Sequence, residues 1–277
     1  MSSEVEKLRQ LLDSTFGLAF LAHLVGSSAW DILSHQQSPL SIASNADAFT
    51  ASNLHQPIFQ IYSDFIREYP FGSAQDWMRL AEELSAAVPE LTRVLSEIAP
   101  ELVECGFAAG FNHTKQFSVL TDAVSEAQGF QPIWKSNADA WWTHPNTVPS
   151  FQGCSANLSE FAIDDGMVSP TAMKSLSVDD LEPVFGIGSA QDWLRLVDRY
   201  PIEASVLHLE KWWPSVAPPL QSVWIPDWRR VSEDYAGVYL SPAAYLGASY
   251  SFLQLPNGRA TFLSGWSPGA TYWLPQS

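Results

Sequence analysis

The stretch that decides the fold reads GVYLSPAAYLGASYSFLQLPNGRATFLSGWSPGATYWL and spans residues 237–274. Short aliphatic and aromatic runs are separated in it by Gly, Pro, Asn and Ser, which is typical of strands joined by turns. Asn257-Gly258 favours a hairpin between residues 253–255 and 260–262. The sequence therefore predicts strands over 237–240, 249–255, 261–264 and 272–274.

Upstream of this stretch, residues 179–236 mix the two kinds of pattern. Residues 184–187 and 223–225 are typical of short strands, whereas 189–198 and 227–235 are typical of helices. Together with the C-terminal strands they predict a mixed α/β domain over residues 179–277.

Residues 1–128 predict a helical domain. Apolar residues recur at helical spacing in 3–13, and Ser14 is a suitable N-cap for a helix that ends at Gly26. Further helices are expected over 58–66, 73–87 and 89–98, with a new start at Pro100. Residues 34–56 are rich in Ser, Asn, Gln and His and are expected to form a polar loop. We expect no strand before residue 128.

Residues 129–178 are interpreted as a Trp-rich packed connector, because Gly, Pro, Asn and Ser are frequent there and Trp134, Trp141 and Trp142 lie close together. A structureless loop of that length inside a compact domain would be unusual. The fold class that follows is α+β: a helical N-terminal part, then a compact mixed α/β C-terminal part with a short, largely antiparallel sheet.

The charge of the chain is strongly negative. Its 277 residues include 14 Lys and Arg against 30 Asp and Glu, which gives a net charge of −16. Residues 1–130 carry 16 acids and 6 bases, so neither the helical part nor the remainder is basic. Binding to nucleic acid or to an anionic membrane needs clustered Lys and Arg, so we expect neither. A basic protein partner would instead be attracted.

Several features predict a cytoplasmic protein. The first residues mix acids with bases, unlike a signal peptide, and the apolar run over 16–25 is too short to cross a bilayer. Only Cys105 and Cys154 occur, and two distant cysteines are expected to be reduced and buried.

One nonapeptide occurs twice. Residues 72–80 read GSAQDWMRL and residues 188–196 read GSAQDWLRL, so Met78 against Leu194 is the only difference. Each copy is expected to begin a helix, with Ser as N-cap and Asp at the third helical position. Two equivalent ligand or partner contacts are the alternative interpretation.

The sequence contains no familiar catalytic or cofactor-binding motif. It has no phosphate-binding glycine loop, no Cys-x-x-Cys and no nucleophile elbow, and its six histidines lack metal-ligand spacing. We therefore expect no cofactor and no metal site, and whether the chain is an enzyme stays open.

Aromatic and acidic side chains are the remaining candidates for a binding site, because aromatic anchors dominate many interfaces. They are Trp212, Trp213, Asp227, Trp228, Trp141 and Trp142.

Residues 184–275 also carry a recurring set of motifs. They include Asp192-Trp193, Arg199-Tyr-Pro201, Trp212, Ile225-Pro-Asp-Trp228, Asp234-Tyr-Ala-Gly-Val-Tyr-Leu240, Gly265-Trp-Ser-Pro268 and Thr271-Tyr-Trp-Leu274. This pattern resembles a family of uncharacterised actinobacterial proteins. The resemblance implies a basic run before Trp212 and a His at the position of Tyr239. Residues 207–211 here read LHLEK instead, which favours binding over catalysis.

These observations predict a non-catalytic interaction or regulatory protein that presents an acidic, aromatic surface to a protein partner. The alternative is an enzyme or sensor of a nucleotide-like or sugar-like ligand in a C-terminal cleft, and a structural subunit of an oligomer is a third. An exposed apolar patch rimmed by acids would favour the first hypothesis, whereas a cleft lined by Trp and charged groups would favour the second.

Overall fold

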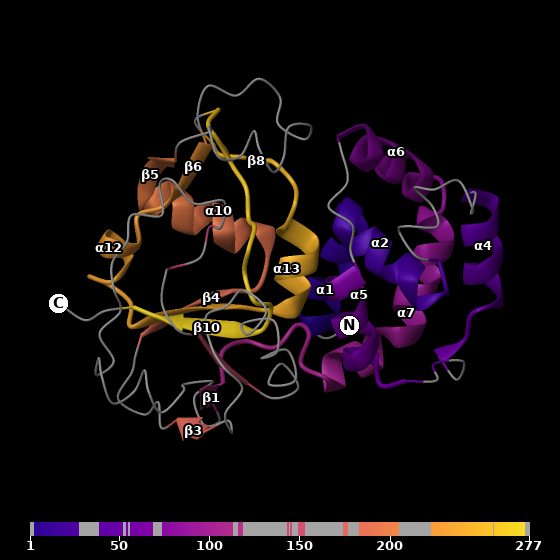
Figure 1. Ribbon diagram of the computed structural model, residues 1–277, viewed down its shortest axis with the longest axis horizontal. Coiled ribbons are helices and arrows are strands. Elements are labelled where there is room, and N and C mark those ends of the chain that lie inside the picture. The colour runs from indigo at the N-terminus through magenta and orange to yellow at the C-terminus, as the bar shows by residue number, and fades with distance from the viewer. Residues whose placement is uncertain are drawn as a thin grey trace.

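The structure is a computed structural model in which the N-terminal helices gather on one side, and the two sheets with two further helices lie on the other (Figure 1). Helix α13 (Pro242–Ala248) lies between the two sides. It describes residues 3–27, 39–51, 54, 56–68, 74–112, 116–118, 143, 145, 149–152, 174–176, 183–204, 223–256 and 258–274.

The N-terminal part forms a helical layer around α2. Its elements are α1 (Ser3–Leu8), the 3-10 helix η1 (Arg9–Asp13), α2 (Thr15–Leu24), α4 (Pro39–Ala48), α5 (Ile58–Glu68), α6 (Ala74–Ser85) and α7 (Val88–Glu104). The limits of α2 are those the sequence predicts. The Ser14 side chain accepts a hydrogen bond from the backbone N–H of Gly17, and Gly26 follows the helix with φ +79°. Almost every residue of α2 is buried, which makes it the centre of the layer.

Two expectations for the helical layer were wrong. Residues 39–48 form helix α4 rather than a polar loop, because Ile42 and Ala46 lie one turn apart and are fully buried. The guanidinium of Arg93 donates hydrogen bonds to the carbonyls of Ala46 and Phe49, which stabilises the C-terminal end of α4. Pro100 also starts no new helix, since α7 continues through it to Glu104.

The strands form two sheets. The six-stranded sheet has the order β3-β1-β2-β10-β7-β4, and the four-stranded sheet has the order β5-β6-β9-β8. Their bounds are β1 Gln116–Ser118, β2 Pro149–Phe151, β3 Lys174–Leu176, β4 Val184–Ile187, β5 Pro201–Ala204, β6 Val223–Pro226, β7 Gly237–Leu240, β8 Leu253–Gln254, β9 Ala260–Thr261 and β10 Ala270–Trp273. Neighbouring strands are antiparallel except for β4 with β7 and β6 with β9.

The expected C-terminal hairpin is confirmed. Leu253 pairs with Thr261 and Gln254 with Ala260, and Gly258 in the connection has φ +77°. The expectation of no strand before residue 128 was wrong, because β1 pairs with both β2 and β3. Strands of three residues are too short to show alternation in a sequence.

Three helices accompany the sheets: α10 (Ala190–Arg199), α12 (Trp228–Val231) and α13 (Pro242–Ala248). The sequence predicts the first two but not α13, whose residues form a small apolar run capped by Ser241. Helix α13 packs against η1 and α2. The Ser14 hydroxyl donates to the carbonyl of Leu246 at 2.7 Å, and the Ala243 N–H donates to that of Phe107 at 2.9 Å.

One continuous cluster of buried side chains includes residues of α2, α7, α10, α13 and the six-stranded sheet. The α+β class expected from the sequence is therefore confirmed, with most strand pairs antiparallel. The proposed boundaries at residues 128 and 178 stay a prediction.

Candidate functional site: an acidic helix with an exposed methionine

Trp228 lies in the core rather than on the surface. Its side chain is 5% exposed, and its ring centroid is 6.0 Å from that of Trp266. Trp266 in turn contacts the rings of Trp193 and Tyr272. The indole N–H of Trp228 has no hydrogen-bond partner. Trp228 therefore contributes packing to the C-terminal part.

Asp227 is the N-cap of α12. Its carboxylate accepts hydrogen bonds from the backbone N–H groups of Arg229 and Arg230 at 3.2 and 3.4 Å. Its own N–H donates to the carbonyl of Tyr200 at 2.7 Å, which joins α12 to the end of α10. These contacts explain Asp227 without a ligand. The other candidate binding residues, Trp141, Trp142, Trp212 and Trp213, lie outside the described residues, so the predicted site as a whole stays a prediction.

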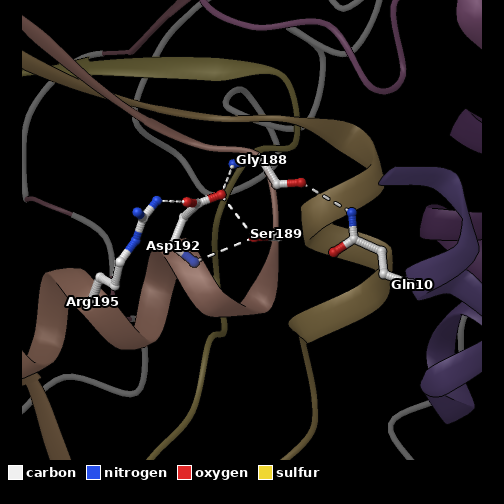
Figure 2. Close-up of polar contacts among 5 residues, drawn as sticks. All are labelled: Gln10, Gly188, Ser189, Asp192 and Arg195. Carbon is white, nitrogen blue, oxygen red and sulfur yellow. Dashed lines mark hydrogen bonds and ion pairs between the residues drawn. The ribbon is translucent and has the colours of Figure 1, made fainter. Parts of the chain in front are cut away.

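The second nonapeptide begins α10 with a reciprocal cap (Figure 2). The Ser189 hydroxyl accepts from the backbone N–H of Asp192 and donates to its carboxylate at 2.8 Å. The same carboxylate oxygen accepts from the N–H of Gly188 at 3.0 Å. Arg195, one turn further, forms an ion pair with Asp192. The expected roles of Ser and Asp in the motif are thus met in this copy.

Gln10 ties this helix start to the N-terminal layer (Figure 2). Its side-chain amide donates to the carbonyl of Gly188 at 3.0 Å. It also lies so close to α13 that a Cβ at Gly247 would stand 2.5 Å from the Gln10 Cγ. A glycine at 247 therefore allows Gln10 to reach α10. No pattern in the sequence around Gln10 points to this contact.

Removing the cap hydroxyl should measurably weaken the protein. We expect Ser189→Ala to lower the free energy of unfolding by about 0.5–2 kcal/mol, because the Asp192 N–H and carboxylate each lose a partner. Urea denaturation followed by circular dichroism measures the change. The control is Ser96→Ala on α7, whose exposed hydroxyl donates only to the Thr92 carbonyl. Equal midpoints for the two variants would contradict the capping role.

The first nonapeptide also begins a helix at its alanine, since α6 starts at Ala74 as α10 starts at Ala190. The last residue of the motif is equally buried in both, with Leu80 and Leu196 each 1% exposed. The copies differ at the seventh residue. Leu194 is partly buried against the core, whereas Met78 is 69% exposed.

Carboxylates surround this exposed methionine in the sequence of α6 and α7. Residues 74–104 contain seven acids (Asp76, Glu82, Glu83, Glu90, Glu97, Glu101, Glu104) and two bases (Arg79, Arg93), a net charge of 2 − 7 = −5. Glu82, one turn after Met78, and Glu104 are exposed. Arg93 is engaged within the layer, by Glu97 and by the end of α4. By sequence α6 and α7 are therefore acidic, and Glu82 and Glu104 are the exposed acids among their described side chains.

A second polar feature lies within the six-stranded sheet. The Gln116 amide donates to the Gln152 side-chain oxygen at 3.0 Å, the Ser150 hydroxyl donates to Gln116 at 2.9 Å, and the Trp273 indole donates to Ser150 at 2.9 Å. Gln152 also donates to the Gly110 carbonyl at 2.8 Å. These side chains are buried and join β1, β2 and β10. No sequence pattern singles them out.

Thr271 occupies the middle of this polar face, level with Ser150 on β2 and Tyr239 on β7. Its hydroxyl is buried and has no hydrogen-bond partner. Burial raises the pKa of Tyr239, although a hydrogen bond with Gln152 opposes the shift. Burial likewise raises the pKa of Tyr62 and of Tyr245. These phenols therefore stay protonated at neutral pH.

No group of three or more His, Cys, Asp or Glu side chains suited to a metal ion is found among the described residues. No helix in the described part of the chain has the length and apolarity needed to cross a membrane. Of the two cysteines, Cys105 is half-buried and Cys154 lies outside the described residues.

Comparisons with protein-family models, with curated proteins and with solved structures found no match for this chain.

Proposed function

We propose that this chain is a non-catalytic interaction protein that binds a basic protein partner through its acidic helices. The observation that carries the proposal is the net charge of −5 over α6 and α7, on helices with an exposed apolar side chain among the carboxylates. Such a surface speeds the approach of a positively charged partner and repels acidic ones. Apolar contact then supplies affinity once the partner has arrived.

Charge reversal with a matched control tests the proposal. Proteins retained by the immobilised chain at low salt are identified, and the most enriched basic protein is purified for affinity measurements. The variant Glu82→Lys/Glu104→Lys reverses two exposed acids of the helical layer, and Glu203→Lys/Glu233→Lys makes the same change of charge on exposed acids of the C-terminal part.

The first pair should weaken binding by about tenfold or more, and the second pair by much less. Affinity for the partner should fall as salt rises from about 0.05 to 0.5 M, because screening shortens the range of the attraction. Duplex DNA, used as a polyanion control, should not bind. A partner whose affinity changes neither with salt concentration nor in either double variant would refute the proposal.

A second candidate function is the binding of a sugar-like or nucleotide-like small ligand, as a sensor or an enzyme. It is favoured by the buried amides and hydroxyls of the six-stranded sheet, and above all by the unpaired Thr271 hydroxyl. Sugars and nucleosides are recognised by such groups together with aromatic rings, and Phe111 contacts both Tyr239 and Trp273 here.

A thermal-shift screen against sugars, nucleosides and nucleotides separates the two candidates. A ligand at ~100 times its Kd adds roughly 2.7 kcal/mol of stability, which raises the Tm by a few degrees. A shift that Thr271→Val abolishes would favour the second function. A screen without hits, combined with a salt-dependent partner, would favour the first.

A further inference from the structure

We propose that the partner docks as a basic amphipathic helix on the exposed face of α6, where it covers Met78 and pairs a Lys or Arg with Glu82. This inference rests on the proposed function and adds the docking face and the form of the partner.

The exposure of Met78 is the first argument. Among the described residues, Met78 at 69% and Ile202 at 37% are the large hydrophobic side chains classed as exposed. A methionine is unbranched and polarizable, so it adapts to the shape of a partner and is favoured on binding surfaces. A single exposed apolar residue is common on protein surfaces, so exposure by itself does not distinguish a docking face.

The second copy of the nonapeptide distinguishes Met78 from an ordinary exposed residue. In α10 the equivalent Leu194 is partly buried, because the chain itself packs over that side of the helix. In α6 the same register buries Leu80 and Leu84 on the side that packs against α2, and leaves Met78 open. One motif thus occurs once with its seventh residue packed against the core and once with that residue exposed.

The geometry and charge of the exposed face define the occupant. Met78, Glu82 and Ser85 are exposed and spaced by four and three residues, so they form one ridge along the helix. A partner helix packs against such a ridge with its own apolar residues at the same spacing. Glu82 beside Met78 requires a basic flank on that partner. A second copy of this chain is disfavoured, because two bodies of charge −16 repel each other.

A designed peptide provides a defined probe. It is an 18-residue helix of Leu and Lys with Leu at positions i, i+3 and i+4, and the matched control replaces every Lys by Glu. The chain contains four methionines, so a methyl spectrum of Met-labelled protein has few signals, and Met78→Leu assigns that of Met78. We expect the Leu/Lys peptide to shift the Met78 signal and the Leu/Glu peptide to leave it unchanged.

Variants complete the test. Met78→Glu and Glu82→Lys should each raise the Kd of the Leu/Lys peptide by about tenfold or more. Met78→Leu and Ile202→Glu should change this Kd by less than about threefold. Circular dichroism confirms that the exposed substitutions leave the unfolding midpoint in place. Binding that leaves the Met78 signal unmoved, or no binding at millimolar peptide, overturns the docking face.

The two proposals fail in different ways. If the captured basic partner still depends on salt and on the Glu82/Glu104 pair while Met78→Glu binds it normally, the proposed function holds and the docking face is wrong. If the chain captures no salt-dependent basic partner, the proposed function fails and the docking face fails with it.

Discussion

Replacing Trp193 with alanine is expected to lower the free energy of unfolding by about 3–5 kcal/mol. Trp193 lies in α10, and its side chain is 0% exposed. Its indole N–H donates to the Thr261 hydroxyl at 3.0 Å, and its ring meets that of Trp266 edge-on at 6.4 Å. Truncation therefore leaves both a cavity and a hydroxyl without its donor.

Denaturant titrations of the wild type and of three variants measure this effect. Thr261→Val removes the hydrogen bond and keeps the volume, so we expect it to cost only about 1 kcal/mol. Trp193→Phe should fall between Thr261→Val and Trp193→Ala. A midpoint for Trp193→Ala close to that of the wild type would mean that the indole is exposed in solution. It would then favour the interpretation of the repeat as two contact sites.

Substitution of Gly17 by alanine is expected to be the most damaging one-carbon change in the helical layer. A Cβ at this position of α2 would stand 2.3 Å from the carbonyl oxygen of Leu11 and 2.6 Å from its Cα. Both atoms belong to the backbone of η1, so neither can turn aside. The cost should lie at or above the upper end of the ~1–3 kcal/mol typical of overpacking. It exceeds the ~1 kcal/mol that alanine gains over glycine in a helix.

The matched control is Gly110→Ala, because a Cβ at Gly110 would meet nothing within 4 Å. Thermal and urea unfolding of the two variants should differ clearly, with Gly110→Ala close to the wild type. If Gly17→Ala unfolded at the wild-type midpoint, η1 would have to lie further from α2 than the structure places it.

Local signals predicted those parts of the fold that depend on local chemistry. Ser14 and Gly26 gave the limits of α2, and the Ser-x-x-Asp start gave α10, because caps act over three or four residues. Helix α4 was not predicted, because only a few apolar residues mark its buried face and Ser and Asn separate them. The strands β1, β2 and β3 depend on pairing with distant segments, which no window of the sequence contains.

The candidate binding residues, too, could not be assigned a role from the local sequence alone. Asp227 and Trp228 have the chemistry of an interface, but capping and core packing use the same side chains, and only the fold decides between them. The exposure of Met78 had no signal, because Met and Leu are both apolar and the repeat alone predicts the same burial for both. The network of Gln116, Ser150 and Gln152 had none, because isolated Gln and Ser residues are common on any surface.

The position of β10 has a consequence for how the protein is made. Among the described strands β10 comes latest in the chain, yet it lies between β2 and β7, and Thr271 pairs with Ser150. At ~5–20 residues per second, roughly 6–24 s pass between the synthesis of these two residues. Until then β2 and β7 expose strand edges on the nascent chain, which can pair with the wrong neighbours. We therefore expect correct folding of the nascent chain to depend on chaperones that shield these edges. Chains that end before residue 270 should aggregate and should not form a shortened native protein.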